Sequence, residues 1–192
     1  MADAGRVIAG SAKGIRLRAP DSGTRPLADR VKQTLFAILE PDLPGARVLD
    51  LFAGSGAAGI EALSRGAAEA IFVEKDPSAA AVIEANLAAT HLGPARVVRA
   101  DAMRWLDGGP YGGAFDIVIV DPPYAESDLL RRVLAVLGAP DAPITGRSRV
   151  VAKHFWRDRP PERIGMLAVE RDRRFGETAL TFYRREEAGE PR

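Results

Sequence analysis

Apolar and polar positions follow two different periods along this 192-residue chain. Near-continuous apolar runs at residues 48–52, 70–73 and 115–120 predict strands that are buried on both faces. Strands that alternate with helices predict an α/β fold built on a mostly parallel sheet. The segments with helical spacing are residues 27–39, 60–66, 77–92 and 127–137.

The N-terminal part has the period of two that half-buried strands show. Residues 6–18 predict a β-hairpin, with strands at Arg6–Ala9 and Ile15–Arg18 around a turn at Gly10–Gly14. In the second strand the two apolar residues would face the protein and the two arginines would face away. Further strands are expected at residues 96–100, 150–152, 166–170 and 178–183.

No internal repeat and no linker divides the chain. We therefore expect a single domain over residues 1–185, in which residues 1–26 form a basic hairpin and loop extension. Residues 186–192 are polar, and we expect them to be a disordered tail.

Composition excludes several classes of site. The chain has no cysteine, which rules out disulfides, iron–sulfur clusters and thiolate zinc, and its two histidines are too few to indicate a metal cluster. No apolar run reaches the length of a membrane span, and the first residues lack the apolar core of a signal peptide. We expect a cytoplasmic protein without a metal.

The net charge of +1 hides an uneven distribution. Basic residues outnumber acidic ones in residues 1–40 and 147–192, whereas acidic residues dominate the middle. Basic ends suit a phosphate backbone, although an ordinary solvated surface has the same composition. The candidate RNA-contacting residues are Lys13, Arg16, Arg18, Arg25 and Arg30.

A glycine turn follows the first buried strand, in the sequence Asp50-Leu51-Phe52-Ala53-Gly54-Ser55-Gly56. With Gly59, its glycines match the spacing of dinucleotide-binding turns, which permits an NAD-dependent oxidoreductase. Asp50 argues against that interpretation, because a carboxylate beside a pyrophosphate is repelled. It suits a ligand with a positive end, such as the amino-acid part of S-adenosylmethionine, or it caps a backbone turn.

Acidic residues recur after the next strands, at Glu74, Asp101 and Asp121. The carboxyl ends of parallel strands share one edge of a sheet, where ligands bind. Glu74 suits two ribose hydroxyls and Asp101 an adenine amine, although Asp101 by itself is better explained as a helix cap. The predicted S-adenosylmethionine contacts are Asp50, Phe52, Gly54, Ser55, Gly56, Glu74, Lys75, Asp101 and Ala102.

The sharpest chemical signal is Asp121-Pro122-Pro123-Tyr124 after the fourth strand. An exocyclic base amine is a poor nucleophile because its lone pair is delocalised into the ring. The Asp121 carboxylate and the Pro122 carbonyl could each accept one of its N–H groups and free that lone pair. The prolines would hold the turn rigid, and the Tyr124 ring offers a stacking surface. These residues are the predicted catalytic set.

This turn matches the [DNS]-P-P-[YFW] signature of amine methyltransferases. Over nearly its whole length the chain resembles the RsmD family of 16S ribosomal RNA guanine-N2 methyltransferases. The resemblance rests on residues 6–10, 25–26, 29–31, 50–56, 61–67 and 121–124, and on Phe175-Gly176-Glu177-Thr178 in place of the family's Y-G-D-T.

The resemblance implies a Rossmann-like class I methyltransferase with a seven-stranded, mostly parallel sheet and an N-terminal β-hairpin extension. It implies S-adenosylmethionine-dependent methylation of the N2 amine of guanine 966 in 16S ribosomal RNA, on an assembling small subunit, by a monomer. Methylation of a DNA amine or a protein glutamine, and RNA binding without catalysis, are the remaining alternatives.

Two segments depart from the family pattern, the first being Leu27-Ala28, where the family usually has Thr-Thr. Lys153-His154-Phe155-Trp156 follows the fifth strand, where the resemblance leads us to expect an acid. Trp156, with Arg157 and Arg159 beside it, could stack on RNA or could pack half-buried.

Overall fold

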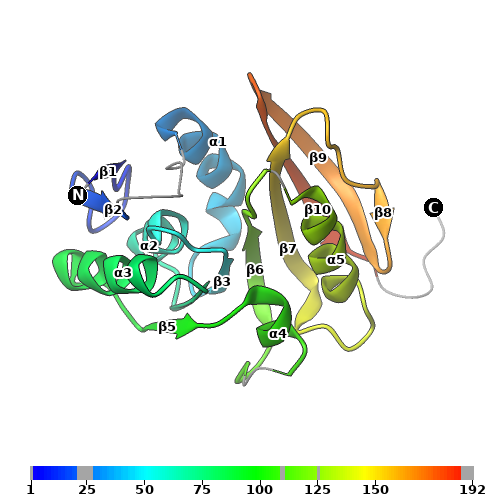
Figure 1. Ribbon diagram of the computed structural model, residues 1–192, viewed down its shortest axis with the longest axis horizontal. Helices are drawn as coiled ribbons and strands as arrows, with labels where there is room; N and C mark the ends of the chain where they lie inside the picture. The colour runs from blue at the N-terminus through cyan, green and yellow to red at the C-terminus, as the bar shows by residue number, and fades with distance from the viewer. Residues whose placement is uncertain (1, 21–27, 109–110, 125, 187–192) are drawn as a thin grey trace.

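The computed structural model describes residues 2–20, 28–108, 111–124 and 126–186 (Figure 1). Its helices and strands, in chain order, are β1 (Ala2–Arg6), β2 (Arg16–Ala19), α1 (Asp29–Leu39), the 3-10 helix η1 (Glu40–Asp42), β3 (Arg47–Leu51), α2 (Ala57–Ser64), β4 (Glu69–Glu74), α3 (Pro77–Thr90), β5 (Ala95–Arg99), α4 (Ala102–Leu106), β6 (Phe115–Val120), α5 (Ser127–Leu137), β7 (Ile144–Phe155), β8 (Arg163–Ile164), β9 (Leu167–Phe175) and β10 (Thr178–Arg185).

One sheet runs through the protein in the strand order β5-β4-β3-β6-β7-β10-β9-β8. The five strands from β5 to β7 are parallel, and β10, β9 and β8 each pair antiparallel with the preceding strand in this order. The predicted α/β fold is confirmed. Within the described residues this sheet has eight strands rather than the expected seven, because the two-residue β8 pairs with β9 at its edge.

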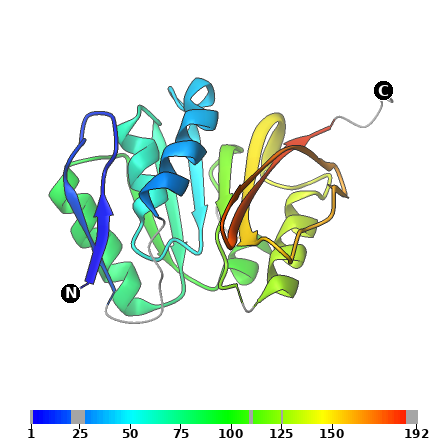
Figure 2. The same cartoon turned by 90° about the horizontal axis from the view of Figure 1, so that it is seen from above.

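Helices cover both faces of this sheet, as the view from above shows (Figure 2). On one face Val48, Phe72 and Ile117 belong to the core that also holds apolar residues of α1, α2, α3 and the β1–β2 hairpin. Their neighbours Leu49 and Val118 point to the other face and share a core with α4 and α5. Two buried faces explain why these strands are apolar without alternation.

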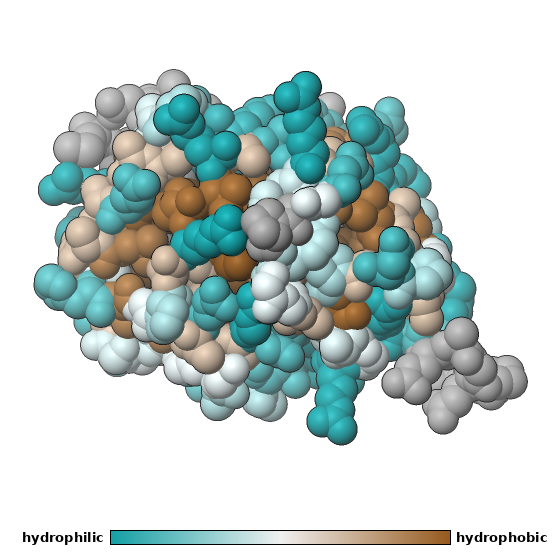
Figure 3. All heavy atoms as spheres, turned by 90° about the horizontal axis from the view of Figure 1, so that it is seen from below, coloured by the Kyte–Doolittle hydropathy of each residue, from teal (hydrophilic) through white to brown (hydrophobic). Residues whose placement is uncertain are grey.

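The strand β5 lies at the open edge of the parallel half and carries Arg96 and Arg99. The face seen from below in Figure 3 shows hydrophilic side chains breaking up the apolar ones. Charged residues on an edge strand oppose pairing with another chain.

Several strand boundaries differ from the predictions, and the largest differences are in β1, β7 and β9, of which β9 covers Leu167–Phe175 rather than residues 166–170. The first hairpin strand is Ala2–Arg6 rather than Arg6–Ala9, because the N–H groups of Ile8 and Ala9 donate to the Glu61 side chain on α2 instead of to a strand. The strand β7 extends over Ile144–Phe155, well beyond residues 150–152, since it pairs with β6 on one side and with β10 on the other.

The β1–β2 hairpin docks on the helices through buried polar groups. Glu61 accepts hydrogen bonds from the Ile8 and Ala9 N–H groups at 2.7 and 3.0 Å, and the Lys32 Nζ donates to the Arg6 carbonyl at 2.6 Å. On α3, Asn86 accepts from the Arg18 N–H and donates to its carbonyl, both at 2.9 Å. The extension is therefore fixed to the domain.

None of the helices in the described residues is long and apolar enough to cross a membrane. Glu186, the first residue of the predicted tail, donates its N–H to the Met166 carbonyl at 2.8 Å. Residues 187–192, like Arg25, lie outside the described residues.

We predict that Glu61→Ala detaches the hairpin and lowers the free energy of unfolding by about 3–5 kcal/mol. The Glu61 carboxylate is fully buried between Lys32 and Arg65, at 3.9 and 2.8 Å, and its removal leaves the fully buried Lys32 ammonium without its counter-charge. Urea denaturation measures the loss, and hydrogen exchange at the Ile8 and Ala9 amides reports the detachment.

The control is Asp3→Ala, which breaks the exposed Asp3–Arg16 ion pair of the same hairpin. Exposed pairs contribute about 0–1 kcal/mol, so this variant should unfold close to the parent. An equal loss in both variants would contradict the anchoring role of Glu61.

Candidate active site at the carboxyl ends of the parallel strands

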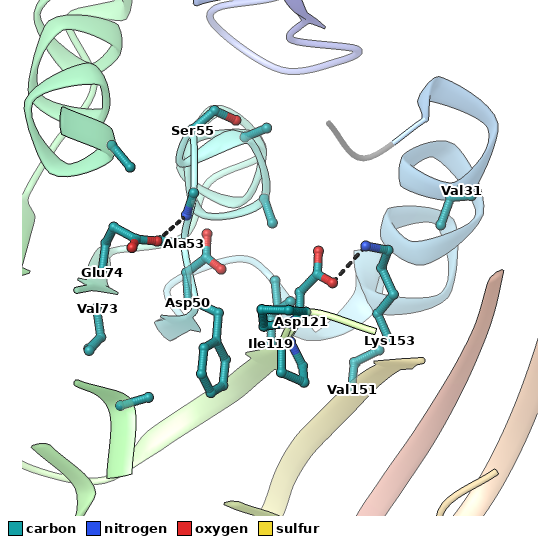
Figure 4. Close-up of a pocket in the computed structure, with 18 of the residues that line it drawn as sticks. Val31, Asp50, Ala53, Ser55, Val73, Glu74, Ile119, Asp121, Val151 and Lys153 are labelled. Carbon is teal, nitrogen blue, oxygen red and sulfur yellow. Dashed lines mark hydrogen bonds and ion pairs between the residues drawn. The ribbon is translucent and has the colours of Figure 1, made fainter. Parts of the chain in front are cut away.

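A cavity of about 820 Å³ opens at the carboxyl ends of β3, β4, β6 and β7 (Figure 4). The segments that follow β3, β4 and β6 form much of its wall, and α1 contributes Val31 and Leu35. From β3 the chain continues outward to β4 and β5 on one side, and then returns to β6 and β7 on the other side of β3. Such switch points are where open α/β sheets bind ligands. The predicted common edge is confirmed.

The glycine turn after β3 has a tightly constrained backbone. Gly54 and Gly56 have φ angles of 56° and 75°, and α2 begins directly after Gly56. Phe52 also has a positive φ of 65°, a conformation that costs a non-glycine residue about 1–3 kcal/mol. At Gly59 a Cβ would lie 2.3 Å from the Phe72 ring, so glycine allows α2 to pack closely on β4.

Two of the predicted acids hold this turn. The Asp50 Oδ2 accepts the Gly59 N–H at 2.9 Å, and the Glu74 Oε2 accepts the Gly54 N–H at 2.8 Å. The second Glu74 oxygen accepts the Asp76 N–H at 2.8 Å. Asp50 thus accepts a hydrogen bond from the first turn of α2, which agrees with the alternative that it caps a backbone turn. It also lines the cavity.

Burial raises the pKa of Asp50 to about 8, and the Asp121 and Glu74 carboxylates add to the rise, while the Gly59 hydrogen bond opposes it. The same effect of burial raises the pKa of Asp121, against the influence of Lys153. The cavity therefore gathers acidic groups in a poorly solvated place, where a cationic ligand group would favour their ionised forms.

The Asp121-Pro122-Pro123-Tyr124 turn lines the same cavity as the glycine turn. Lys153 Nζ lies 2.6 Å from the Asp121 Oδ1, and a quarter of the Asp121 side chain is exposed. The Tyr124 hydroxyl lies 2.6 Å from the Thr178 Oγ1, and its ring centroid is 5.0 Å from the Lys153 Nζ. The predicted catalytic residues and the glycine turn are thus brought together.

The other predicted contacts divide into two groups. Phe52, Gly54, Ser55, Lys75 and Ala102 line the cavity, as do Asp50 and Glu74. Asp101 and Gly56 are not among its lining residues. The Asp101 Oδ1 accepts the Arg104 N–H at 3.1 Å and caps α4, which is the alternative that its sequence context favoured.

The candidate RNA residues lie on the N-terminal segment. Lys13, Arg16, Arg18 and Arg30 are exposed, and Arg16 forms an ion pair with Asp3 at 2.9 Å. Ala19 and Ala28, on either side of the segment that is not described, line the cavity. The basic hairpin therefore lies next to the mouth of the site.

Trp156 is half-buried, and two guanidinium groups lie over its ring. The centroid is 3.6 Å from the Arg174 Cζ and 4.9 Å from the Arg157 Cζ. Arg159 instead pairs with Asp172 at 2.5 Å. Of the two alternatives for Trp156, half-buried packing within the protein is the one that this structure shows.

Several lining residues were not predicted from the sequence. Lys153 was noted only as unusual, and its contact with Asp121 comes from β7, which is adjacent to β6 in the sheet. Glu177 and Thr178 reach the cavity from the β9–β10 turn. Their signal was the Phe175–Thr178 motif that the family resemblance singled out. Within the described residues there is no group of three or more His, Asp or Glu that could hold a metal ion.

Comparison with known proteins assigns the chain to a family. The family model described as "Conserved hypothetical protein 95" matches residues 5–184. The "Ribosomal RNA small subunit methyltransferase D" of Escherichia coli K12 is 37% identical over 96% of this chain and 92% of its own length. The chain belongs to the RsmD family.

Two further similar proteins agree with the chain, one in length and one in both length and fold. YlbH of Bacillus subtilis is 38% identical over 94% of this chain and 98% of its own length. The solved structure of yhhF from Escherichia coli superposes with a TM-score of 0.82 at 36% identity, covering 95% of this chain and 98% of that chain. The protein is therefore a methyltransferase of the class I fold.

We predict that Asp50→Asn flattens the pH dependence of stability. Because the pKa of Asp50 is about 8 in the folded protein and near 4 in the unfolded chain, only the unfolded chain is ionised between these values. Raising the pH through this window therefore lowers the free energy of unfolding, by up to about 1.4 kcal/mol per pH unit from this one proton.

Denaturant titrations between pH 5 and pH 8, without ligands, measure this slope. The amide keeps an acceptor for the Gly59 N–H but has no proton to lose, so the variant should have the smaller decline. Asp141→Asn, on an exposed loop, is the control and should keep the parental slope. A parental slope in Asp50→Asn would contradict the raised pKa.

Proposed function

We propose that the protein transfers a methyl group from S-adenosylmethionine to the exocyclic N2 amine of a guanine in 16S ribosomal RNA, guanine 966, during small-subunit assembly. The observation that carries the proposal is the shared cavity. Asp121, Pro122 and Tyr124 line the same space as Asp50 and the glycine turn. A methyl donor and a flat base can therefore be held next to each other.

The cavity fits S-adenosylmethionine in size and chemistry. A volume of about 820 Å³ lies within the range of small-molecule sites. Asp50 faces a place where the cationic amino group would be stabilised, Glu74 has lone pairs for ribose hydroxyls, and Phe52, Val73 and Ala102 offer apolar contact for the adenine. When bound, the group supplies an electrophilic methyl on its sulfonium sulfur.

The residues of this chain act on the base. The Asp121 oxygen that does not face Lys153 accepts one N–H of the exocyclic amine, and the Pro122 carbonyl accepts the other. Stacking on Tyr124 contributes about 1–3 kcal/mol, and the Thr178 contact fixes the ring. Asp121 then takes up the proton that the amine loses. Fixed geometry of this kind makes roughly 7–11 kcal/mol available to catalysis.

The substrate assignment is supported by the relatives and by the basic N-terminal segment. The Escherichia coli relative is described as a methyltransferase of the small ribosomal subunit RNA. In this chain the exposed Lys13, Arg16 and Arg18 lie on the hairpin next to the cavity. We extend the proposal to a monomer that works in the cytoplasm, where ribosomes are assembled.

We predict that Asp121→Ala lowers the single-turnover rate of methyl transfer to 16S ribosomal RNA by at least about a hundredfold. Binding of S-adenosylhomocysteine, measured by calorimetry, should survive, because Asp121 is assigned to the base and not to the cofactor. An unchanged transfer rate would contradict the role of Asp121.

The position of the methyl group tests the substrate. Mapping of modified nucleotides in ribosomal RNA from cells with and without the gene should show one N2-methylguanine that depends on the gene. Label from the methyl donor that enters DNA or a protein glutamine, and not ribosomal RNA, would contradict the substrate assignment.

We also predict that Arg18→Ala weakens RNA binding in a salt-dependent way. The Arg18 side chain is exposed, whereas its backbone is held by Asn86, so the substitution removes charge and leaves the hairpin docked. The slope of log affinity against log salt should decrease by about 1. Arg132→Ala, exposed on α5 across the sheet, is the control, and an equal change in both variants would contradict a hairpin interface.

A further inference from the structure

Lys153 is the residue that departs most clearly from the expected pattern. It replaces an acid that the family resemblance leads us to expect after the fifth strand. Its backbone pairs with Leu180 across the β7–β10 ladder, which fixes where the side chain leaves the sheet. Only 13% of that side chain is exposed.

The Lys153 side chain reaches across the cavity wall to the catalytic turn (Figure 4). The Nζ lies 2.6 Å from the Asp121 Oδ1 and 5.0 Å from the centroid of the Tyr124 ring. One ammonium group thus contacts both the carboxylate that would accept the amine and the ring that would stack on the base. The second Asp121 oxygen, Oδ2, is not part of this contact.

The charges around Asp121 make this contact consequential. Asp50 at the end of β3 and Glu74 at the end of β4 are acidic and buried. A carboxyl in poorly solvated surroundings with acidic neighbours tends to keep its proton. A protonated Asp121 could not be an ionised acceptor for an N–H group. The ionisable groups that line the cavity are Asp50, Glu74, Lys75, Asp76, Asp121, Tyr124, Lys153 and Glu177.

We propose that Lys153 is a positioning residue for methyl transfer: it holds one Asp121 oxygen, keeps that carboxyl ionised and directs the other oxygen toward the substrate amine. The proposal rests on the proposed function of the same site. It also assigns the proton acceptor. Lys153 already carries its proton, so the proton that leaves the amine passes to Asp121 and then to water.

The contact between Lys153 and Tyr124 extends this role to the ring. The Tyr124 hydroxyl is held by Thr178, and the Lys153 ammonium lies near the ring, where cations are attracted to the π-system. Asp121, Lys153 and Tyr124 therefore form one connected unit in which the acceptor and the stacking surface keep a fixed relation.

The test compares Lys153→Met, which keeps much of the length and loses the charge, with Lys153→Arg, which keeps the charge. In Lys153→Met the acid limb of the kcat–pH profile should move to higher pH by about one unit or more, because an adjacent cation lowers a carboxyl pKa by about 1–3. On the acid limb kcat should fall by up to about tenfold for each unit of that shift, with little change in KM for RNA. Lys153→Arg should restore the parental profile.

A second readout does not depend on activity. Carbon-13 NMR titration of the Asp121 carboxyl in the ligand-free protein should give a higher pKa in Lys153→Met than in the parent, and a parental value in Lys153→Arg. Arg132→Met removes an exposed charge on α5 and should leave both the profile and the titration unchanged. Thermal unfolding shows that each variant is folded, and Lys153→Gln takes the place of Lys153→Met if the latter is not.

The outcomes separate the two proposals. A parental pH profile and an unshifted Asp121 titration in Lys153→Met would overturn the role of Lys153, as would a loss of activity that Lys153→Arg does not restore. If the parent protein transfers no methyl group to ribosomal RNA, the proposed function fails. The titration then still decides whether Lys153 controls the ionisation of Asp121.

Discussion

Two buried carboxylates and the backbone that they bind hold the centre of this protein. Asp50 accepts the Gly59 N–H and Glu74 accepts the Gly54 N–H, so the ends of β3 and β4 are tied to the turn that starts α2. The turn that they hold contains Phe52, Gly54 and Gly56 at positive φ. Both carboxyl groups are buried and line the cavity, so the residues that shape the turn also place acidic groups there. The position of the cavity therefore follows from the register of the parallel strands.

That acidity has a consequence for the catalytic turn. Asp121 enters a space that already contains Asp50 and Glu74, where burial raises its pKa and a nearby cation opposes that rise. Lys153 supplies that cation from β7. The residue at position 153 of β7 thus influences the ionisation of Asp121, the proposed acceptor for the substrate amine.

The basic N-terminal hairpin is organised by a second buried charge cluster. Glu61 on α2 receives two hairpin N–H groups and faces Lys32 and Arg65. This arrangement fixes the hairpin on the side of the sheet that carries α1, α2 and α3, beside the cavity (Figure 1). The basic hairpin and the cavity are therefore connected through the same helices.

Much of this protein was determined by local patterns in its sequence. The strands β3, β4 and β6 are buried on both faces, and their apolar runs could be recognised in the sequence. The glycine turn and the Asp121–Tyr124 turn could also be recognised, because a tight backbone needs glycine and proline at fixed spacing. The tertiary structure decided the rest. Ile8 and Ala9 donate to Glu61 and not to a strand, Asp101 caps α4 instead of entering the cavity, and Lys153 meets Asp121 across two neighbouring strands. These outcomes depend on partners far away along the chain, and sequence spacing alone carries no information about which partner a polar group finds.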